Sequence, residues 1–368
     1  MGTSGGKKSR NSARKDVPRI GDVARLAGVS TATVSRTLSV PGRVHPDTQE
    51  LVMAAVRRLG YTPNAAARNL RAGRSMTILV VVPRLTNPFF SEIIRGIDET
   101  LSAAGYGLII GDLDNAYDKE AHLVDLAFEG RLDGAIVLSG HMPTSGGRSL
   151  QEANIPLVSI CIKIPGTDVP YVLVNDRPAV QNAMRHLMAL GHRRFAYLAG
   201  PSRSYGNDSR YRGFRDALAE NEAATGARLK GDYTLESGAA AGRAFLDLSP
   251  RPTAVISAGD MMAIGFMKTI RDAGLAIPRD VSIIGFDGLE MSQYCEPPLS
   301  TLRQPRRALG RAGANSVLQL LGDPSSPSAS LSQTLEVELI LRESVGPPPA
   351  AERPGQNAPA ATTGHAAS

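Results

Sequence analysis

The sequence predicts a small all-α helix-turn-helix head followed by a larger α/β core of two lobes, each built on a doubly wound parallel sheet. Three observations predict this architecture. Between Arg19 and Leu38, apolar residues recur three and four positions apart on either side of a glycine, which is typical of a helix-turn-helix. From Thr77 onward, continuous apolar runs alternate with helix-like segments, and the alternation starts again near Asp176. The length of 368 residues is also too great for one hydrophobic core.

Charge separates the head from the core. Residues 1–75 contain 14 Lys and Arg but only four Asp and Glu, which gives them a net charge of +10. The formal charge of the whole chain is +6, so the remaining residues carry −4. A basic head on a mildly acidic body indicates that the head alone binds a polyanion.

The composition and the motifs argue against several classes of protein. Two cysteines are too few for a disulfide framework or a zinc cluster. The sequence has no apolar run near the roughly 18 residues of a membrane span and no secretory signal, so we expect a cytoplasmic, nucleoid-associated protein without a membrane partner. It also lacks metalloprotease, phosphate-loop and nucleophile-elbow motifs. We therefore expect no catalytic residues, no cofactor and no metal site.

The first helix of the head is expected to begin at Ile20 and end before Gly28. Its predicted apolar face consists of Ile20, Val23, Leu26 and Ala27. Ser30 is a predicted N-cap for a second helix over residues 31–38. In a helix-turn-helix this second helix enters the DNA major groove, although the same pattern also fits an ordinary helical hairpin. The candidate DNA-contacting residues here are Thr31, Ala32, Thr33, Ser35 and Arg36.

A third helix is expected from Pro46 to Leu59. Its predicted apolar stripe consists of Leu51, Val52, Ala55, Val56 and Leu59. Residues 18–62 then form the DNA-binding domain, preceded by a disordered basic arm over residues 1–17. Residues 63–75 are either a plain linker or a hinge helix that becomes ordered on DNA. In the second interpretation Asn64 caps the hinge helix, alanines such as Ala67 permit close pairing, and Leu70 inserts between base steps.

The core is expected to span residues 76–345, with a disordered tail over residues 346–368. The predicted strands lie at 77–83, 106–112, 133–139, 156–161, 194–200, 253–259, 281–287 and 333–342. The predicted helices lie at 89–104, 119–128, 176–190, 208–221, 237–248 and 305–321. The N-lobe would combine residues 76–175 with 303–325, and the C-lobe would combine 176–302 with 326–345. The tail has no heptad repeat, which favours a dimer over a tetramer.

Polar and aromatic residues near the strand ends predict a ligand site between the lobes. Phe89 and Phe90 follow the first strand and can either offer a flat surface to a ring or pack in the core. Arg210 lies near the start of a helix, where a guanidinium can bind a hydroxyl or a carboxylate. Asp260 and Asp287 end two other strands, where a carboxylate can accept hydrogen bonds from a diol. Each aspartate can instead cap a helix, most readily Asp260.

Five segments resemble the LacI family of bacterial transcriptional regulators: DVARLAGVSTATVSRTL, LGYTPNAAARNL, NPFFSEIIRGI, IIGFD and PPLSTLRQP. They lie between Asp22 and Pro305, and the family pattern extends to about Arg342. The segments TILVVVPRLTNPFFSEIIRGI, DMMAIG and YCEPPLSTLRQP look nearest the cytidine-repressor branch. The resemblance implies a homodimer with a core like the periplasmic binding proteins and a hinge helix. It also implies that each head binds half of a pseudopalindromic double-stranded DNA operator.

The resemblance further implies a set of effector-contacting residues: Phe89, Phe90, Asn175, Arg210, Tyr233, Asp260 and Asp287. Cys161 replaces a polar contact of several members, and Ser204 and Gly206 replace polar groups of purine-binding members, so a purine-base corepressor is not expected. A nucleoside or sugar effector, ribose-bearing or otherwise sugar-like, remains open. The expected protein is a sequence-specific repressor whose operator affinity this effector controls. Two alternatives remain: a solute-binding protein, and a constitutive DNA-binding protein without effector control.

Overall fold

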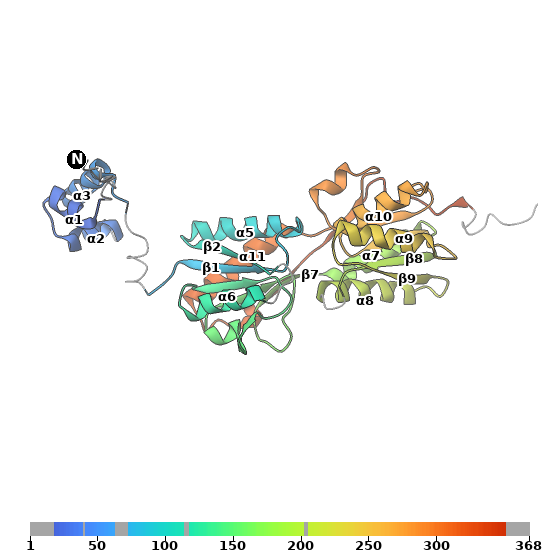
Figure 1. The fold of residues 1–368 in the computed structure, drawn as a ribbon, viewed down its shortest axis with the longest axis horizontal. Coiled ribbons are helices and arrows are strands. Elements are labelled where there is room, and N and C mark those ends of the chain that lie inside the picture. The colour runs from blue at the N-terminus through green and yellow to red at the C-terminus, as the bar shows by residue number, and fades with distance from the viewer. Residues whose placement is uncertain (1–17, 40, 63–72, 114–117, 202–204, 351–368) are drawn as a thin grey trace, which may run out of the picture. The chain divides into compact units, whose positions relative to one another are not determined.

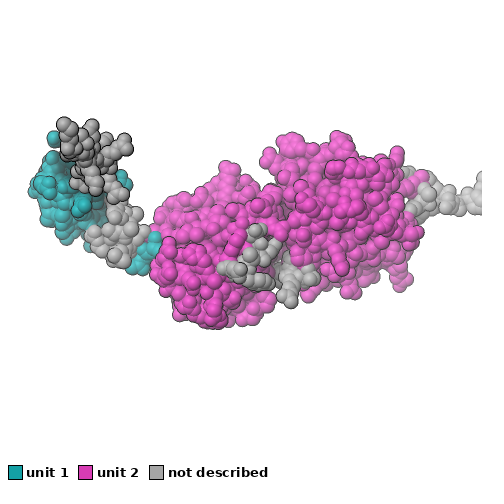
Figure 2. All heavy atoms as spheres, in the orientation of Figure 1, with its two compact units in different colours: residues 1–75 teal, residues 76–368 magenta. Residues whose placement is uncertain are grey.

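The computed structural model describes residues 18–39, 41–62, 73–113, 118–201 and 205–350. The chain divides into two compact units, residues 1–75 and residues 76–368 (Figure 2). Several sequence predictions lie outside the described residues. These are the basic arm, Asn64, Ala67, Leu70, Ser204 and most of the C-terminal tail.

Unit 1 contains the three predicted helices of the head. They are α1 (Ile20–Ala27), α2 (Thr31–Ser39) and α3 (Pro46–Leu59), with a 3-10 turn at Pro41–Arg43. Val23, Val34 and Val52, one from each helix, are fully buried in a shared core. The first helix ends at Gly28, which has a left-handed φ of 67°. The hydroxyl of Ser30 then accepts a hydrogen bond from the third amide of the next helix at 3.1 Å, which confirms the predicted cap.

The predicted burial of two leucines of the head is wrong. Leu26 is 41% exposed and Leu51 is 57% exposed, whereas both were expected in the core. A helix of this size buries a narrow stripe, and the fully or largely buried positions Val23 and Ala24, together with Val52 and Ala55, occupy it. The two leucines lie just outside that stripe.

Unit 2 consists of two lobes, each with a six-stranded sheet (Figure 1). The N-lobe sheet contains β1 (Thr77–Val82), β2 (Gly107–Asp112), β3 (Gly134–Val137), β6 (Leu157–Ile160), β7 (Tyr171–Val174) and β13 (Gln333–Leu335). The C-lobe sheet contains β8 (Arg194–Ala199), β9 (Thr225–Lys230), β10 (Ala254–Ser257), β11 (Ser282–Asp287), β12 (Ser300–Arg303) and β14 (Glu338–Ile340). The strand orders, β13-β7-β6-β3-β1-β2 and β14-β12-β11-β10-β8-β9, follow the same pattern. All neighbours are parallel except β12 and β14.

Helices cover both faces of each sheet (Figure 1). They are α5 (Phe89–Ala103), α6 (Asp118–Phe128), α7 (Asp176–Ala189), α8 (Tyr205–Ala219), α9 (Leu235–Leu246), α10 (Asp260–Asp272), α11 (Arg306–Gly322) and α12 (Ser328–Leu331). The shorter elements are the hairpin β4 (Thr144–Ser145) and β5 (Arg148–Ser149), with 3-10 helices η2 (Leu150–Ala153) and η3 (Glu290–Tyr294). In β1, the side chains of Ile78, Val80 and Val82 join the core beneath α5 and α11, while Leu79 and Val81 join the core beneath α6. Burial on both faces explains why β1 reads as an unbroken apolar run.

Helices α5 and α11 pack closely in the N-lobe. A Cβ atom on Gly96 would lie 2.2 Å from the carbonyl oxygen of Arg307, so only glycine permits this approach. On the surface beside it, Glu99 accepts hydrogen bonds from Arg307 and Arg311, and those bonds lower the pKa of Glu99 to about 2.

The chain crosses between the lobes three times, and the third crossing corrects a prediction. The segment predicted as one strand over 333–342 is two strands, β13 in the N-lobe and β14 in the C-lobe, separated by Glu336 and Val337. Residues 326–335 therefore belong with the N-lobe rather than with the C-lobe. Because β13 and β14 are both extended, the alternation of apolar residues continues from one strand to the other. The sequence pattern therefore does not indicate where the chain crosses between the lobes. The strands β7, β9 and β12 were not predicted.

The C-terminal end of the core extends past its predicted limit. Gly346, assigned to the tail, accepts hydrogen bonds from the side chains of His192 and Ser282 and donates one to Ser282. Among the described residues, no helix is both long enough and apolar enough to cross a membrane.

Candidate functional site

The outward surface of α2 in unit 1 carries most of the predicted DNA-contacting residues. Thr31, Ala32 and Arg36 are exposed and Ser35 is half-buried, while Val34 beside them is fully buried in the core. The helix period thus places the short polar groups and the guanidinium on the side opposite the core. Such a surface can enter a major groove.

Thr33 differs from its neighbours on α2. It is half-buried, and its hydroxyl lies 2.9 Å from the hydroxyl of Ser30. This side chain therefore takes part in the N-terminal cap of the helix.

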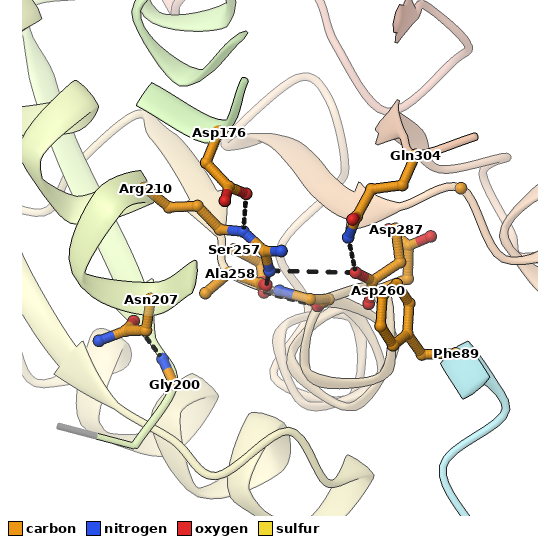
Figure 3. Close-up of polar contacts among 12 residues, drawn as sticks. Phe89, Asp176, Gly200, Asn207, Arg210, Ser257, Ala258, Asp260, Asp287 and Gln304 are labelled. Carbon is orange, nitrogen blue, oxygen red and sulfur yellow. Dashed lines mark hydrogen bonds and ion pairs between the residues drawn. The ribbon is translucent and has the colours of Figure 1, made fainter. Parts of the chain in front are cut away.

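The charged centre of unit 2 is Arg210, which projects from α8 and is only 7% exposed (Figure 3). Its Nε donates to Asp176 Oδ1 at 2.7 Å, and its Nη1 donates to the carbonyl of Ala258 at 2.6 Å. The same Nη1 lies 3.9 Å from Asp287 Oδ1. The guanidinium carbon lies 3.7 Å from the centre of the Phe286 ring, a cation–π arrangement. The buried guanidinium of Arg210 thus lies beside two buried carboxyl groups, those of Asp176 and Asp287.

Burial governs the protonation of this centre. Burial raises the pKa of Asp287 to about 7, Arg210 opposes that shift, and Asp260 reinforces it. The pKa of Asp176 is also raised by burial and lowered by Arg210. Burial alone would lower the pKa of Arg210, but the carboxyl groups of Asp176 and Asp287 and the phenol of Tyr233 raise it overall. The guanidinium is therefore charged, while Asp287 exchanges its proton near neutral pH.

Two further residues lie against the carboxyl group of Asp287. Gln304, only 3% exposed, donates from Nε2 to Asp287 Oδ1 at 2.9 Å. A Cβ atom on Gly259 would lie 3.3 Å from Asp287 Oδ2 and 3.1 Å from a ring carbon of Tyr233. The Tyr233 ring also lies against Gly200, where a Cβ atom would be 2.3 Å from its Cζ. Asp287 and Tyr233 therefore flank the same glycine at the strand ends.

Asp260 is close to this centre, but its oxygens are bonded within the protein. Its Oδ1 accepts the hydroxyl of Thr301 at 2.7 Å, and its Oδ2 accepts the amide of Leu289 at 2.8 Å and the hydroxyl of Ser292 at 2.7 Å. The alternative prediction that Asp260 caps α10 is wrong, because Gly259 is the N-cap and no side chain caps that helix.

Asn175 lies at a crossing between the lobes. Its Nδ2 donates to the carboxylate of Glu336, and its Oδ1 accepts the amide of Val337 at 2.8 Å. The backbone amide of Asn175 donates to the carbonyl oxygen of Leu335 at 3.1 Å. These bonds join two of the segments that cross between the lobes. None of them is to Arg210 or to Asp287.

At the start of α5 the N-lobe presents a pair of aromatic side chains. Phe89 and Phe90 are each 7% exposed, and their rings meet edge to face at 5.1 Å. In Figure 3 the Phe89 side chain points toward Asp287. Cys161 follows β6, and burial raises the pKa of its thiol, with the carboxyl group of Asp176 adding to the shift. The thiol is therefore neutral.

The structure thus brings Arg210, Asp287 and Tyr233 together in the C-lobe. Sequence reasoning missed Asp176 and Gln304, because the strands that they follow within two residues, β7 and β12, were not predicted. In the described part of the chain, no group of three or more His, Cys, Asp and Glu side chains is arranged to hold a metal ion.

Comparison with known proteins identifies the family. Residues 19–64 match the bacterial regulatory proteins of the lacI family, and residues 184–345 match a periplasmic binding protein-like domain. The HTH-type transcriptional repressor CytR of Escherichia coli is 37% identical over 325 residues, covering 88% of this chain and 95% of that protein.

Solved structures agree with this match. The Lac repressor dimer bound to operator and the anti-inducer ONPF has a TM-score of 0.79 and 28% identity, covering 89% of this chain and 99% of that one. A LacI family regulator from Enterococcus faecium with bound ribose has a TM-score of 0.65 and 28% identity, covering 74% and 99%. The chain therefore belongs to the lacI family of bacterial regulatory proteins and is a DNA-binding transcriptional regulator.

Proposed function

We propose that this protein is a repressor that binds a pseudopalindromic operator as a homodimer and releases it when an effector binds between the lobes of the core. The observation that carries the proposal is the outward surface of α2, where Thr31, Ala32 and Arg36 are exposed on a basic three-helix unit. CytR and the Lac repressor are named as repressors, and we propose that this protein likewise acts without catalysis, in the cytoplasm beside the nucleoid.

In this proposal the residues of α2 read base edges. Arg36 binds a guanine through O6 and N7, and Ala32 contacts a thymine methyl group. Thr31, Thr33 and Ser35 contribute shorter contacts to bases or phosphates. Asn64, Ala67 and Leu70, which lie outside the described residues, would form the hinge and insert Leu70 into the minor groove.

We infer the class of effector from the polar side chains of the C-lobe and the aromatic side chains of the N-lobe. The carboxyl group of Asp287 can accept hydrogen bonds from a diol, and Arg210 can donate to a hydroxyl or carbonyl oxygen. Phe89 and Phe90 favour a planar or apolar part of the same ligand. Tyr233 and Asn175 complete the proposed contacts, Asn175 only after exchanging bonds that it now makes within the protein. Asp260, whose oxygens accept hydrogen bonds from Leu289, Ser292 and Thr301, lies behind these contacts. We infer a nucleoside or a pentose-like sugar, and ribose is the ligand in one similar structure.

The DNA part of the proposal is tested with Arg36→Ala and an operator selected from random duplexes. Losing a bidentate guanine contact should cost about 1–3 kcal/mol on the selected operator and relax the preference at one base pair. Arg58→Ala, at an exposed position of α3 outside the surface of α2, is the control, because losing a charge that is not aimed at a base should affect binding to every duplex alike. Fluorescence anisotropy at two salt concentrations separates the two effects. Equal loss on matched and mismatched duplexes for Arg36→Ala would remove it from the base-reading residues.

The effector part is tested by calorimetry with a panel of nucleosides and sugars, followed by Asp287→Ala. The variant should lose the effector response and keep the operator affinity of the parent. A parent protein that binds DNA but no member of the panel would favour constitutive DNA binding.

A further inference from the structure

The segment that follows Asp287 carries one residue of the C-lobe into the core of the N-lobe. We call residues 288–292 the interlobe segment. Leu289 is 2% exposed and belongs to the same buried cluster as Phe89 and Phe90. Among the described buried members of that cluster, Leu289 alone comes from the C-lobe, and the partly buried Met261 of α10 packs against the cluster from the same lobe. The two lobes therefore share an apolar contact directly beside the candidate effector site.

The interlobe segment is held in one shape by the C-lobe. Asp260 accepts the amide of Leu289 and the hydroxyl of Ser292 through the same oxygen, Oδ2. Gly288 has a left-handed φ of 69°, and a Cβ atom there would lie 2.6 Å from the Cγ of Arg303, so only glycine fits. The buried carboxylate thus fixes the direction in which Leu289 leaves the C-lobe.

A guanidinium joins the interlobe segment to the N-lobe. Arg306, the first residue of α11, donates from Nη2 to the carbonyl of Gly288 at 3.1 Å. Its Nη1 makes a longer contact of 3.5 Å with the carbonyl of Pro88, directly before Phe89. This side chain therefore binds the backbone on both sides of the junction, next to the aromatic pair and next to Asp287.

We propose that the interlobe segment is a latch between the lobes, with Leu289 as its anchor and Asp260 as the residue that positions it. Leu289 packs in the same cluster as Phe89 and lies two residues after Asp287. An effector held between Phe89 and Asp287 must therefore either preserve the packing of Leu289 in the N-lobe or break it. The free energy of the contact then sets the fraction of molecules whose lobes are in the effector-competent arrangement. This inference rests on the proposed function for its biological consequence, while the latch itself is a property of the core.

Asp260 thereby takes a different role from the one its sequence position predicts. Its two oxygens accept hydrogen bonds from Thr301, Leu289 and Ser292, and the last two belong to the interlobe segment. It acts on the effector through the latch, as a positioning residue.

The experiment compares Leu289→Ala with Leu331→Ala in the full chain. Leu331, on α12, is 4% exposed and belongs to the same cluster, but it lies within the N-lobe. Each change truncates a buried leucine to alanine and should lower the melting temperature. Without effector or DNA, Leu289→Ala should speed amide hydrogen exchange at least tenfold in the peptides spanning residues 86–95 and 284–294. Leu331→Ala should leave exchange in the second peptide as in the parent.

Two milder variants protect the test against misfolding. Leu289→Val shortens the anchor, and Asp260→Asn keeps the shape of the positioning side chain while removing its charge. Both should raise exchange in the same two peptides, including the one in the N-lobe that Asp260 does not bond. If exchange rises only in the 284–294 peptide, which Asp260 bonds directly, the role of Asp260 is local and the latch is disproved. Equal exchange patterns for Leu289→Ala and Leu331→Ala would also overturn it.

The consequence for regulation is measured separately on the selected operator. In Leu289→Ala, the effect of added ribose or cytidine on operator affinity should differ from the parent by about tenfold, and in Leu331→Ala it should not. An altered exchange pattern combined with absence of any operator or effector binding would support the latch and count against the proposed function instead.

Discussion

The two lobes share one strand order, yet they contribute different groups beside Asp287. The N-lobe contributes the aromatic pair Phe89 and Phe90 and the neutral thiol of Cys161, and Asp176 follows its strand β7, whereas the C-lobe contributes the buried guanidinium of Arg210 and the buried carboxyl group of Asp287. Equal topology therefore fixes where a ligand lies and leaves open what each lobe offers it. A ligand that satisfies both lobes needs an apolar or planar part on one side and hydroxyl groups on the other.

The difference also affects how each lobe is stabilised. The aromatic end of the N-lobe gains by burial against Leu289, while the charged end of the C-lobe is stable only if every buried ion keeps its partners. The C-lobe should thus be far more sensitive to the loss of one polar side chain.

The largest effect is expected from Arg210→Met. This change leaves Asp176 and Asp287 buried without their counter-ion, and breaking such a pair typically costs about 3–5 kcal/mol of unfolding free energy. Arg185→Met is the matched control, because Arg185 pairs with Glu220 on an exposed surface of the same lobe and should change stability little. Urea denaturation measures both. Similar losses in the two variants would contradict the distinction between a buried and an exposed ion pair.

The next effect concerns pH and Asp287→Asn. The folded protein raises the pKa of Asp287 to about 7 from 3.8, so between about pH 4 and 7 the folded state holds a proton that the unfolded state has released. The unfolding free energy of the parent should therefore fall as pH rises through this window, by at most about 1.4 kcal/mol per unit for one group.

Asp287→Asn should reduce this slope without abolishing it, because burial also raises the pKa of Asp260, to about 6. Glu99 in the N-lobe shifts the other way, so its contribution is lost only as pH falls below 4.5 toward about 2. Denaturation curves at several pH values test the prediction. A slope in the variant equal to that of the parent would show that Asp287 stays ionised.

The smallest effect is expected from Phe90→Leu in the N-lobe. Replacing a ring by a similar apolar side chain should cost less than about 1.5 kcal/mol of stability. Loss of stacking on an effector ring should weaken effector binding by up to about tenfold. Calorimetry with the effector found in the panel checks this value. If Phe90→Leu binds the effector as well as the parent does, the ring only fills the N-lobe core.

Much of the fold was predictable because its pattern is local. The runs at β1, β8 and β11 are buried on both faces, and the head carries helix periodicity around Gly28. The edge strand β9 was missed because most of its side chains are exposed or half-buried, which gives no apolar run. Leu26 and Leu51 were misplaced since periodicity identifies the buried side of a helix but not the width of the buried stripe.

The site was predictable in residue type and less so in bonding. Arg210 and Asp287 were identified from their positions near strand ends, and the structure joins them. The partners of Asp260 and Asn175, such as Thr301 and Glu336, come from segments far along the chain. Their hydrogen bonds depend on how the segments pack, which no local pattern records.

The split of one extended segment into β13 and β14 has a consequence for biosynthesis. The sheet of the N-lobe lacks its last strand until Leu335 has been added, and the sheet of the C-lobe lacks its own until Ile340 follows. A nascent chain on the ribosome therefore completes both sheets within one short stretch of synthesis, first the N-lobe sheet and then the C-lobe sheet.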